Sequence, residues 1–441
     1  MIKNINTIII FKYYIILFPL IYLAGPAISD GLIVISSITF LVLIILKKEI
    51  IKKNKELKAL FLLFFLFLLF SVSFIFNFNS KSFIEYVLYL RFFVFLFLLI
   101  HFLKYFDEID YTKIFKIWIF VYIFVLLDTL LQYYLGVNIF GFEPDQSFDG
   151  YNQISRLTGI FRNEPIVGTF LSKFLIIPVG YFIIKYNSNN KNYLIFFLIF
   201  LSTFAILVST QRAAIIYLIL FFIFLFLLII RSCKFNVILS IKSISLLLIP
   251  LILFNIIAIN SFDNTYKERI LSTFVEISKL KDKDVQKIDK NQNFANKFSF
   301  YDYYVNSSYA KLYMTALKLY GENKYLGLGF KNYRNVCREY QKDLENFKSY
   351  LCSTHPHNYY VELFVENGIF GIIFILIILF LLFENFKKNF FNTNNSLQIV
   401  FVLCLFIYLW PLVPTGSFTN NYNSVMFWYL FGIALGVKSK V

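Results

Sequence analysis

Apolar residues occur along the chain in long runs that short polar segments interrupt. A run of about 18 or more apolar residues can cross the roughly 30 Å of a bilayer core as a helix. We expect twelve such spans, at residues 7–24, 27–46, 59–76, 83–103, 113–135, 164–186, 193–210, 212–230, 236–259, 358–383, 397–414 and 422–437. The pattern therefore predicts an all-α membrane protein that crosses the bilayer many times.

The composition of the chain supports the same class. Of the 441 residues, 59% are hydrophobic and only 15% are charged, whereas soluble domains average about 25% charged residues. Such a chain lacks the polar side chains that would cover a water-facing surface. This excludes a soluble globular protein.

The lysines predict how the spans are oriented. Short loops rich in lysine and arginine stay in the cytoplasm, and the segment 47–58 alone contains six lysines. With twelve spans, both termini lie in the cytoplasm and one large segment, 260–356, lies outside. Because the net charge of +16 is spread over short loops, we expect no nucleic-acid partner.

The outer segment divides the chain into transmembrane helices in 1–259, a loop domain at 260–356 and transmembrane helices in 357–441. Within the loop domain, the charged stretch 279–297 predicts a flexible linker. Apolar residues then recur at helical spacing from Tyr309 to Tyr320 and again from Phe330 to Phe347. This spacing predicts two amphipathic helices.

Two of the four cysteines, Cys337 and Cys352, fall in the outer loop domain. Disulfides persist outside the cytoplasm, so we expect a bridge between this pair, and two free thiols are the alternative. A continuous helix over the 15 residues that separate them would hold the pair about 22 Å apart. The second amphipathic helix therefore has to end early if the bridge forms.

The eight arginines are distributed differently from the 34 lysines. Only Arg231 falls in an expected cytoplasmic loop. The other seven lie within a span or toward the outer side, and four of them are candidates for one site: Arg91, Arg156, Arg162 and Arg212. An arginine presents a planar fork of donors that matches phosphate oxygens in pairs, so these four predict a site for a lipid phosphate. The alternative is that they snorkel, pair with nearby carboxylates or cap helices.

Two of the three histidines, His355 and His357, flank a proline just before the expected span at 358–383. A neutral imidazole accepts a proton near pH 7 without a large pKa shift, so the pair predicts a general base on the same side as the arginines. The alternative is a histidine that solvates the end of a span. We expect no metal site, because no third histidine lies nearby and the cysteine spacing does not suit zinc.

The residues after the histidines form a spaced pattern. His357 and Asn358 are followed by nine residues, then Gly368, two more residues and Gly371. Asn358 can also cap the helix that follows. Here the chain resembles the O-antigen ligase and O-antigen polymerase superfamily, whose ligases have a His, then Asn, Ser or Gln, and two glycines at this spacing.

Further segments carry the same resemblance: RLTGIFRNEPIVGTFL (156–171), STQRAAIIYL (209–218) and GLGFKNYR (327–334). The chain departs from the family pattern at one place. Relatives often have Asn-Glu-Asn where this chain has Asn163-Glu164-Pro165, which puts a role for the third position in doubt.

The resemblance implies a membrane glycosyltransferase with a GT-C-like fold in the bacterial inner membrane, with its active site in the periplasm. Such proteins move a glycan from undecaprenyl diphosphate to an acceptor sugar without a nucleotide cofactor or a metal. By resemblance, the arginines hold the diphosphate and His357 activates the acceptor hydroxyl, while His355 orients its neighbour or contacts substrate. Glu143, Asp149 and Glu164 are rival bases on the same face.

The expected span count, the single outer loop and the histidine pattern favour a ligase, whose acceptor is a sugar of the lipid A core. One alternative is a polymerase, which joins lipid-linked glycan units. Another is a non-enzymatic transporter of the lipid-linked glycan. A transporter needs charged residues along a path between both faces, whereas the informative residues here gather at one face.

Overall fold

The computed structural model describes residues 2–47, 55–75, 77–149, 152–185, 192–233, 308–321, 326–340, 351–391 and 397–436. Within these ranges the protein is almost entirely helical, and the one sheet is a two-stranded hairpin. Seven of the described helical stretches are long and apolar enough to cross a membrane, which confirms the expected class. The expected span at 236–259 and the linker at 279–297 lie outside the described residues, so the count of twelve stays a prediction.

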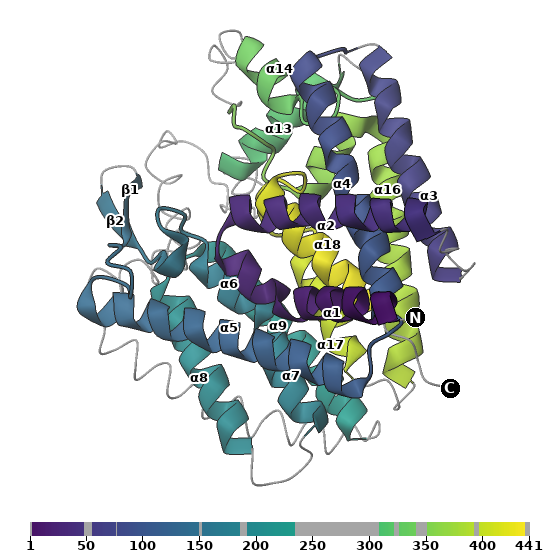
Figure 1. The fold of residues 1–441 in the computed structure, drawn as a ribbon. Helices are drawn as coiled ribbons and strands as arrows, with labels where there is room; N and C mark the ends of the chain where they lie inside the picture. Colours follow the sequence, from purple (N-terminus) through teal and green to yellow (C-terminus); the bar gives the residue numbers. More distant parts are fainter. Residues whose placement is uncertain are drawn as a thin grey trace, which may run out of the picture.

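The first part of the chain contributes a group of long helices around α4. Its helical elements are α1 (Ile2–Leu23), α2 (Pro26–Lys47), α3 (Lys55–Leu69), η1 (Phe70–Ile75), α4 (Ser80–Leu103) and α5 (Glu108–Leu135). α4 contacts both α2 and the last described helix, α18 (Asn421–Gly436), and α1 packs along α5 (Figure 1). The two ends of the sequence therefore share one core.

Local sequence sets where α4 and α5 begin and where α5 ends. α4 begins after Asn79, whose side-chain oxygen accepts two backbone N–H groups of the first turn. α5 begins with a capping box between Asp107 and Asp110, which pairs donors that the helix itself leaves unpaired. It ends at Gly136, whose φ of 77° is the left-handed conformation that glycine adopts without strain.

The segment after α5 is a hairpin and a turn held against that helix. Its elements are β1 (Asp145–Asp149), which pairs antiparallel with β2 (Asn152–Arg156), and η2 (Gly159–Phe161). Gln132 of α5 anchors the turn, because its Oε1 accepts the N–H groups of Thr158 at 2.9 Å and Gly159 at 2.8 Å. This anchor fixes the chain just before Arg162.

The expected span at 164–186 corresponds to one apolar stretch, Val167–Lys185, which is long enough to cross a membrane and consists of two consecutive helices. These are α6 (Val167–Phe174) and α7 (Ile176–Lys185), and α8 (Asn192–Val208) and α9 (Arg212–Ser232) follow them. Pro178 lies in the first turn of α7 and has no N–H to donate to the Phe174 carbonyl, so the hydrogen-bond ladder is interrupted here. α6 packs closely on the segment before α9, since a Cβ on Gly168 would lie 2.1 Å from the Ser209 hydroxyl.

Two short helices lie in the described part of the segment 260–356. α13 (Ser308–Gly321) confirms the first expected amphipathic helix. The second, α14 (Tyr333–Glu339), is shorter than expected and begins after Phe330, and residues 341–350 lie outside the described ranges. Both helices pack on α16 (Tyr359–Phe391). They share a buried cluster with that helix: Ala316, Leu319, Leu328, Tyr333, Cys337 and Val365.

The helix observed in the expected span at 397–414 is shorter than expected. The helix there, α17 (Gln398–Tyr408), has 11 residues and is about 16 Å long. Pro411 and Pro414 follow in the same apolar stretch, and proline cannot continue a helix without losing a hydrogen bond. Residues 409–420 therefore form a loop between α17 and α18, and this loop becomes part of the site.

Candidate active site

The histidine loop, residues 351–358, ends in a helix cap. Asn358 is the residue before α16, and its Oδ1 accepts the N–H groups of Tyr360 at 2.9 Å and Val361 at 3.2 Å. Its Nδ2 donates to the Pro411 carbonyl at 2.7 Å. One side chain thus fixes both the start of α16 and the 409–420 loop.

His357 is held by its backbone and by its ring. Its φ of 57° is a left-handed conformation that few residues other than glycine adopt, and its carbonyl accepts the N–H of Thr415 at 2.8 Å. Its Nε2 lies 3.4 Å from the Ser353 hydroxyl. The ring centres of His355 and His357 are 4.0 Å apart, and the ring of Tyr309 from α13 meets His357 edge-on at 6.0 Å.

Glu362, in the first turn of α16, holds the 409–420 loop in place. The side chain is only 1% exposed. It accepts hydrogen bonds from the Ser417 hydroxyl at 2.5 Å, the Phe418 N–H at 2.7 Å and the Thr419 hydroxyl at 2.9 Å. Because the same loop supplies Thr415 to the His357 carbonyl, Glu362 acts on the histidine through the loop.

Glu366, one turn further along α16, holds the segment GLGFKNYR. Its carboxylate accepts the N–H of Lys331 at 2.9 Å, and the N–H of Leu328 donates to the Val365 carbonyl at 2.9 Å. Gly327 has a φ of +80°, and a Cβ there would lie 2.5 Å from the Glu366 backbone. The conformation and the close approach together require glycine at this position.

The two motif glycines shape α16 itself. Gly368 has φ 58° and ψ −140°, so it breaks the helix into two pieces. A Cβ on Gly371 would lie 1.9 Å from the Leu363 carbonyl oxygen, because the break brings that carbonyl against the next turn. The glycine spacing of the motif is therefore explained by backbone geometry.

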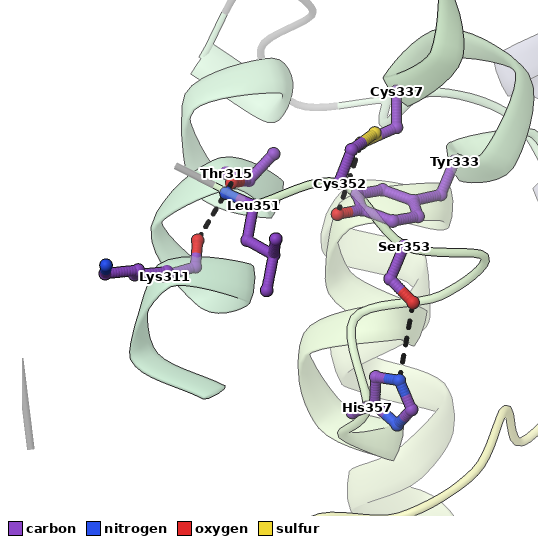
Figure 2. Close-up of a disulfide and its surroundings, with 8 residues drawn as sticks. All are labelled: Lys311, Thr315, Tyr333, Cys337, Leu351, Cys352, Ser353 and His357. Atoms are coloured by element: carbon purple, nitrogen blue, oxygen red, sulfur yellow. Dashed lines mark hydrogen bonds between the residues drawn. A yellow bond between two sulfur atoms is a disulfide. The ribbon is translucent and has the colours of Figure 1, made fainter. Parts of the chain in front are cut away.

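A disulfide ties the histidine loop to α14. Cys337 and Cys352 are bonded, with Cα atoms 5.8 Å apart. The N–H of Leu351 also donates to the Thr315 hydroxyl of α13 at 2.9 Å. Figure 2 shows the disulfide beside Tyr333 and the Ser353 hydroxyl directed at the His357 ring. Both short helices, α13 and α14, thus hold the loop that carries the histidines.

A cavity of about 1460 Å³ opens beside the histidine loop. Its walls come from the α1–α2 turn, α5, the segment 160–166, α6, the histidine loop and the 409–420 loop, and α9, α13, α17 and α18 each contribute a tyrosine. Most of the lining side chains are apolar or aromatic. The charged and titratable exceptions other than tyrosine are Arg162, Glu164, Lys173, His355 and His357.

The surroundings of the histidines keep both imidazoles neutral. Burial lowers the pKa of His355 to about 4, and the nearby charge of Arg334 acts in the same direction. Burial also lowers the pKa of His357 to about 4, and its neighbour His355 adds to the effect. At neutral pH both rings therefore have a nitrogen that can accept a proton.

Residues 197–376 match the sequence model of the family described as O-antigen ligase. This match supports the resemblance to the O-antigen ligase and O-antigen polymerase superfamily. The matched residues run from α8 into α16, so they include the histidine loop and both motif glycines. No curated protein matches the chain.

Of the arginines that resemblance to the superfamily singles out, Arg162 lines the cavity. It is exposed, has φ 56°, and lies over the Phe142 ring at 5.6 Å. Arg91 instead faces Asp30, to which its Nε and Nη2 donate at 2.7 Å and 3.0 Å, and Asn421 joins the same cluster. The charge of Arg91 is therefore balanced inside the helix bundle.

The other two predicted arginines lie away from the cavity wall. Arg156 is the last residue of β2, and its Nε is buried without a hydrogen bond to any described residue. Arg212 is exposed at the first position of α9. Neither lines the cavity.

The three acidic residues proposed as rival bases differ in their position relative to the cavity. Glu164 is exposed and lines the cavity, whereas Glu143 does not line it, and Asp149 ends β1. In the part of the chain that the structure describes, histidine, cysteine and acidic side chains do not gather in groups of three that could hold a metal ion.

Sequence reasoning missed three residues of this site: Lys173, Glu362 and Tyr309. Two of them could have been found from the sequence. Lys173 and Glu362 are ionisable residues within expected membrane spans, and such residues are candidates for function. No sequence feature marked Tyr309 as a site residue, since its helix meets His357 only through tertiary packing.

Proposed function

We propose that the protein is an O-antigen ligase. In this proposal it transfers a glycan from undecaprenyl diphosphate to a sugar of the lipid A core, at the periplasmic face of the bacterial inner membrane. One observation carries the proposal. The motif histidines and Arg162, which are far apart in the sequence, line the same cavity. The superfamily match supports the class of enzyme.

The groups around the cavity suit an inverting transfer. The acceptor hydroxyl oxygen attacks the anomeric carbon of the donor sugar, the bond from that carbon to the phosphate oxygen breaks, and its electron pair stays on the diphosphate. His357 accepts the hydroxyl proton, and Arg162 stabilises the charge that develops on the diphosphate. Undecaprenyl diphosphate is released, and attack opposite the leaving group inverts the anomeric carbon.

The apolar wall of the cavity suits a lipid-linked donor. Ile28, Phe120 and Phe140 line it and are 53%, 58% and 62% exposed. Exposed apolar side chains beside a few charged groups match a ligand with a polar head and a hydrocarbon chain. The proposal therefore places the diphosphate near Arg162 and the polyprenyl chain along α2 and α5.

His355 is assigned to the support of its neighbour and to substrate contact. Its Nδ1 lies 2.9 Å from the Thr354 hydroxyl. Its Nε2 is buried and has no hydrogen bond to any described residue. A buried polar atom without a partner costs free energy, so we expect Nε2 to gain its partner when substrate binds.

Transfer by the purified protein in lipid nanodiscs, with undecaprenyl-diphosphate-linked glycan as donor, tests the proposal. A ligase moves the glycan to lipid A core oligosaccharide and leaves a second lipid-linked unit unchanged. Elongation of the lipid-linked chain would identify a polymerase instead. No transfer to either acceptor, together with movement of the lipid-linked glycan across vesicle membranes, would identify a transporter.

The His357→Asn variant tests the base. Asparagine tolerates the left-handed conformation at this position, so the variant removes the imidazole without adding backbone strain. We expect transfer to fall by about 10²–10⁴-fold while donor binding is kept. His101→Asn is the matched control, because this histidine lies in the last turn of α4 and does not line the cavity. If transfer activity fell only a few-fold, the role of His357 would be structural rather than that of a base.

A further inference from the structure

Lys173 is a positive charge inside a membrane helix, and the roles assigned above do not use it. It lies near the end of α6, which together with α7 forms one of the apolar spans. Its side chain lines the same cavity as the histidines. Its ammonium nitrogen is 4.7 Å from the ring centres of both Tyr217 and Tyr408. The two rings hold the charge at a defined place in the cavity wall.

The protein around Lys173 does not neutralise it. Among the described residues Lys173 forms no ion pair, and Glu164 is the only carboxylate that lines the cavity. An ammonium group away from water is costly unless an anion or hydrogen-bond acceptors compensate it. The faces of the two tyrosine rings supply part of that compensation. A bound anion would supply the rest.

Two structural roles explain the position of Lys173 less well. A lysine near a helix C-terminus can interact with the last carbonyl groups, but this ammonium lies between side chains of other helices. A snorkelling lysine extends toward water at the membrane surface. The nitrogen of Lys173 instead lies between Tyr217 of α9 and Tyr408 of α17.

We propose that Lys173 binds a phosphate group of the lipid-linked donor, together with Arg162; this inference rests on the proposed function. These two are the basic residues that line the cavity in the described part of the chain. A diphosphate offers one phosphate group to each of them. Arg162 is the exposed partner with a planar fork of donors, and Lys173 is the enclosed point charge.

Binding of glycan-free undecaprenyl diphosphate to the purified protein in nanodiscs tests the inference, because this probe has both phosphates and no sugar. Lys173→Met keeps the apolar stem and removes the charge, and we expect affinity to fall by about tenfold or more. Lys173→Arg restores the charge and should recover most of the affinity. Lys185→Met is the matched control, since Lys185 ends α7 and contacts the exposed Glu108 at 3.8 Å.

Equal affinity of the wild type and Lys173→Met would overturn the inference. A loss that appears only when the lipid carries its glycan would overturn it as well, because Lys173 would then contact the sugar. If Lys173→Met does not fold, Lys173→Gln gives the same comparison with a polar head. The binding assay needs no acceptor, so a wild type that binds the probe but transfers no glycan would overturn the proposed function alone.

Discussion

The two sides of the cavity are held in different ways. On the histidine side, the carbonyl of His357 accepts a hydrogen bond from Thr415, in a loop that Glu362 fixes. On the arginine side, the chain is anchored at Gly159, and Arg162 lies exposed over the Phe142 ring. The histidine belongs to a hydrogen-bonded frame, whereas the arginine extends from a turn.

This difference matches two different tasks. A general base must lie within about 3 Å of one particular proton, so a frame that fixes its position favours the reaction. A cation that meets a flexible lipid headgroup benefits from a long side chain that can follow the phosphate. We infer that the histidine side sets the geometry of transfer and that the arginine side sets the affinity for the donor.

Among residues that only position the site, the largest effect should come from Glu362, which fixes the histidine side. Glu362→Ala leaves the buried donors of Ser417, Phe418 and Thr419 without their acceptor, at about 1–3 kcal/mol for each buried donor. We expect a lower unfolding temperature and a fall in kcat of about 100-fold, since small misplacements of a catalytic group are costly. The KM for the donor should change little.

Glu384→Ala is the control on the same helix. Glu384 is 53% exposed and pairs with Lys387 at 3.9 Å, and such exposed pairs contribute about 0–1 kcal/mol. Thermal unfolding and donor-dependent kinetics compare the two variants. Similar behaviour of both would mean that the 409–420 loop does not fix the base.

The next prediction concerns pH, because the buried histidine side should behave differently from an exposed histidine. Because burial lowers the pKa of His355 and His357 to about 4, the neutral base persists well below the ordinary histidine pKa of about 6.5. At about pH 5.5 an ordinary histidine has lost about nine-tenths of its neutral form, whereas we expect kcat/KM to be nearly unchanged there. An acid limb centred near about pH 6.5 in the pH profile of kcat/KM would contradict the buried site.

The same pKa shift predicts how stability depends on pH. The unfolded chain takes up protons on these histidines below about pH 6.5, but the folded protein does so only near 4. The stability that neutral burial contributes is therefore fully present above about 6.5 and is lost as the pH falls toward about 4. Unfolding temperatures across this window measure the effect.

A smaller effect should mark the arginine side. Arg162→Lys keeps the charge but loses the paired donors, so we expect donor affinity to fall by about fivefold with the unfolding temperature unchanged. Arg212→Lys is the comparison, because Arg212 does not line the cavity. Measurements of donor binding by both variants test this prediction. Equal losses of affinity would show that lining the cavity does not distinguish Arg162 from Arg212 in donor binding.

The smallest effect on transfer should come from the disulfide. It closes a loop with a sequence separation of 15 residues, and such a crosslink stabilises by about 3 kcal/mol in the chain-entropy model. Since Thr415 and Asn358 still hold the histidine loop, the Cys337→Ser/Cys352→Ser double variant should unfold at a lower temperature but lose less activity than Glu362→Ala. A loss of transfer as large as that of Glu362→Ala would make the disulfide part of the frame.

The helices were largely predictable because hydrophobic length and capping residues are local properties. The expected spans at 83–103 and 212–230 lie within α4 and α9. The error in the expected span at 397–414 has a local cause too. Pro411 and Pro414 follow the short helix α17, since apolar prolines add to a hydrophobic run although they interrupt a helix.

The site was predictable in part. The spacing of Asn358, Gly368 and Gly371 could be read from the sequence, but its cause is a cap and a helix break that become visible only in three dimensions. Among the arginines, charge and residue type did not distinguish Arg162, which lines the cavity, from Arg91, which pairs with Asp30. That distinction depends on a contact between α2 and α4.

The sequence by itself determined the membrane class, most of the helices and the presence of a histidine motif, because each depends on neighbouring residues. Tertiary structure alone decided which side chains meet. Thr415 reaches His357 through the 409–420 loop, and Lys173 reaches the same cavity from α6. These contacts join segments that are distant along the chain, and their free energy comes from burying polar groups against specific partners. No local pattern in the sequence records such pairs.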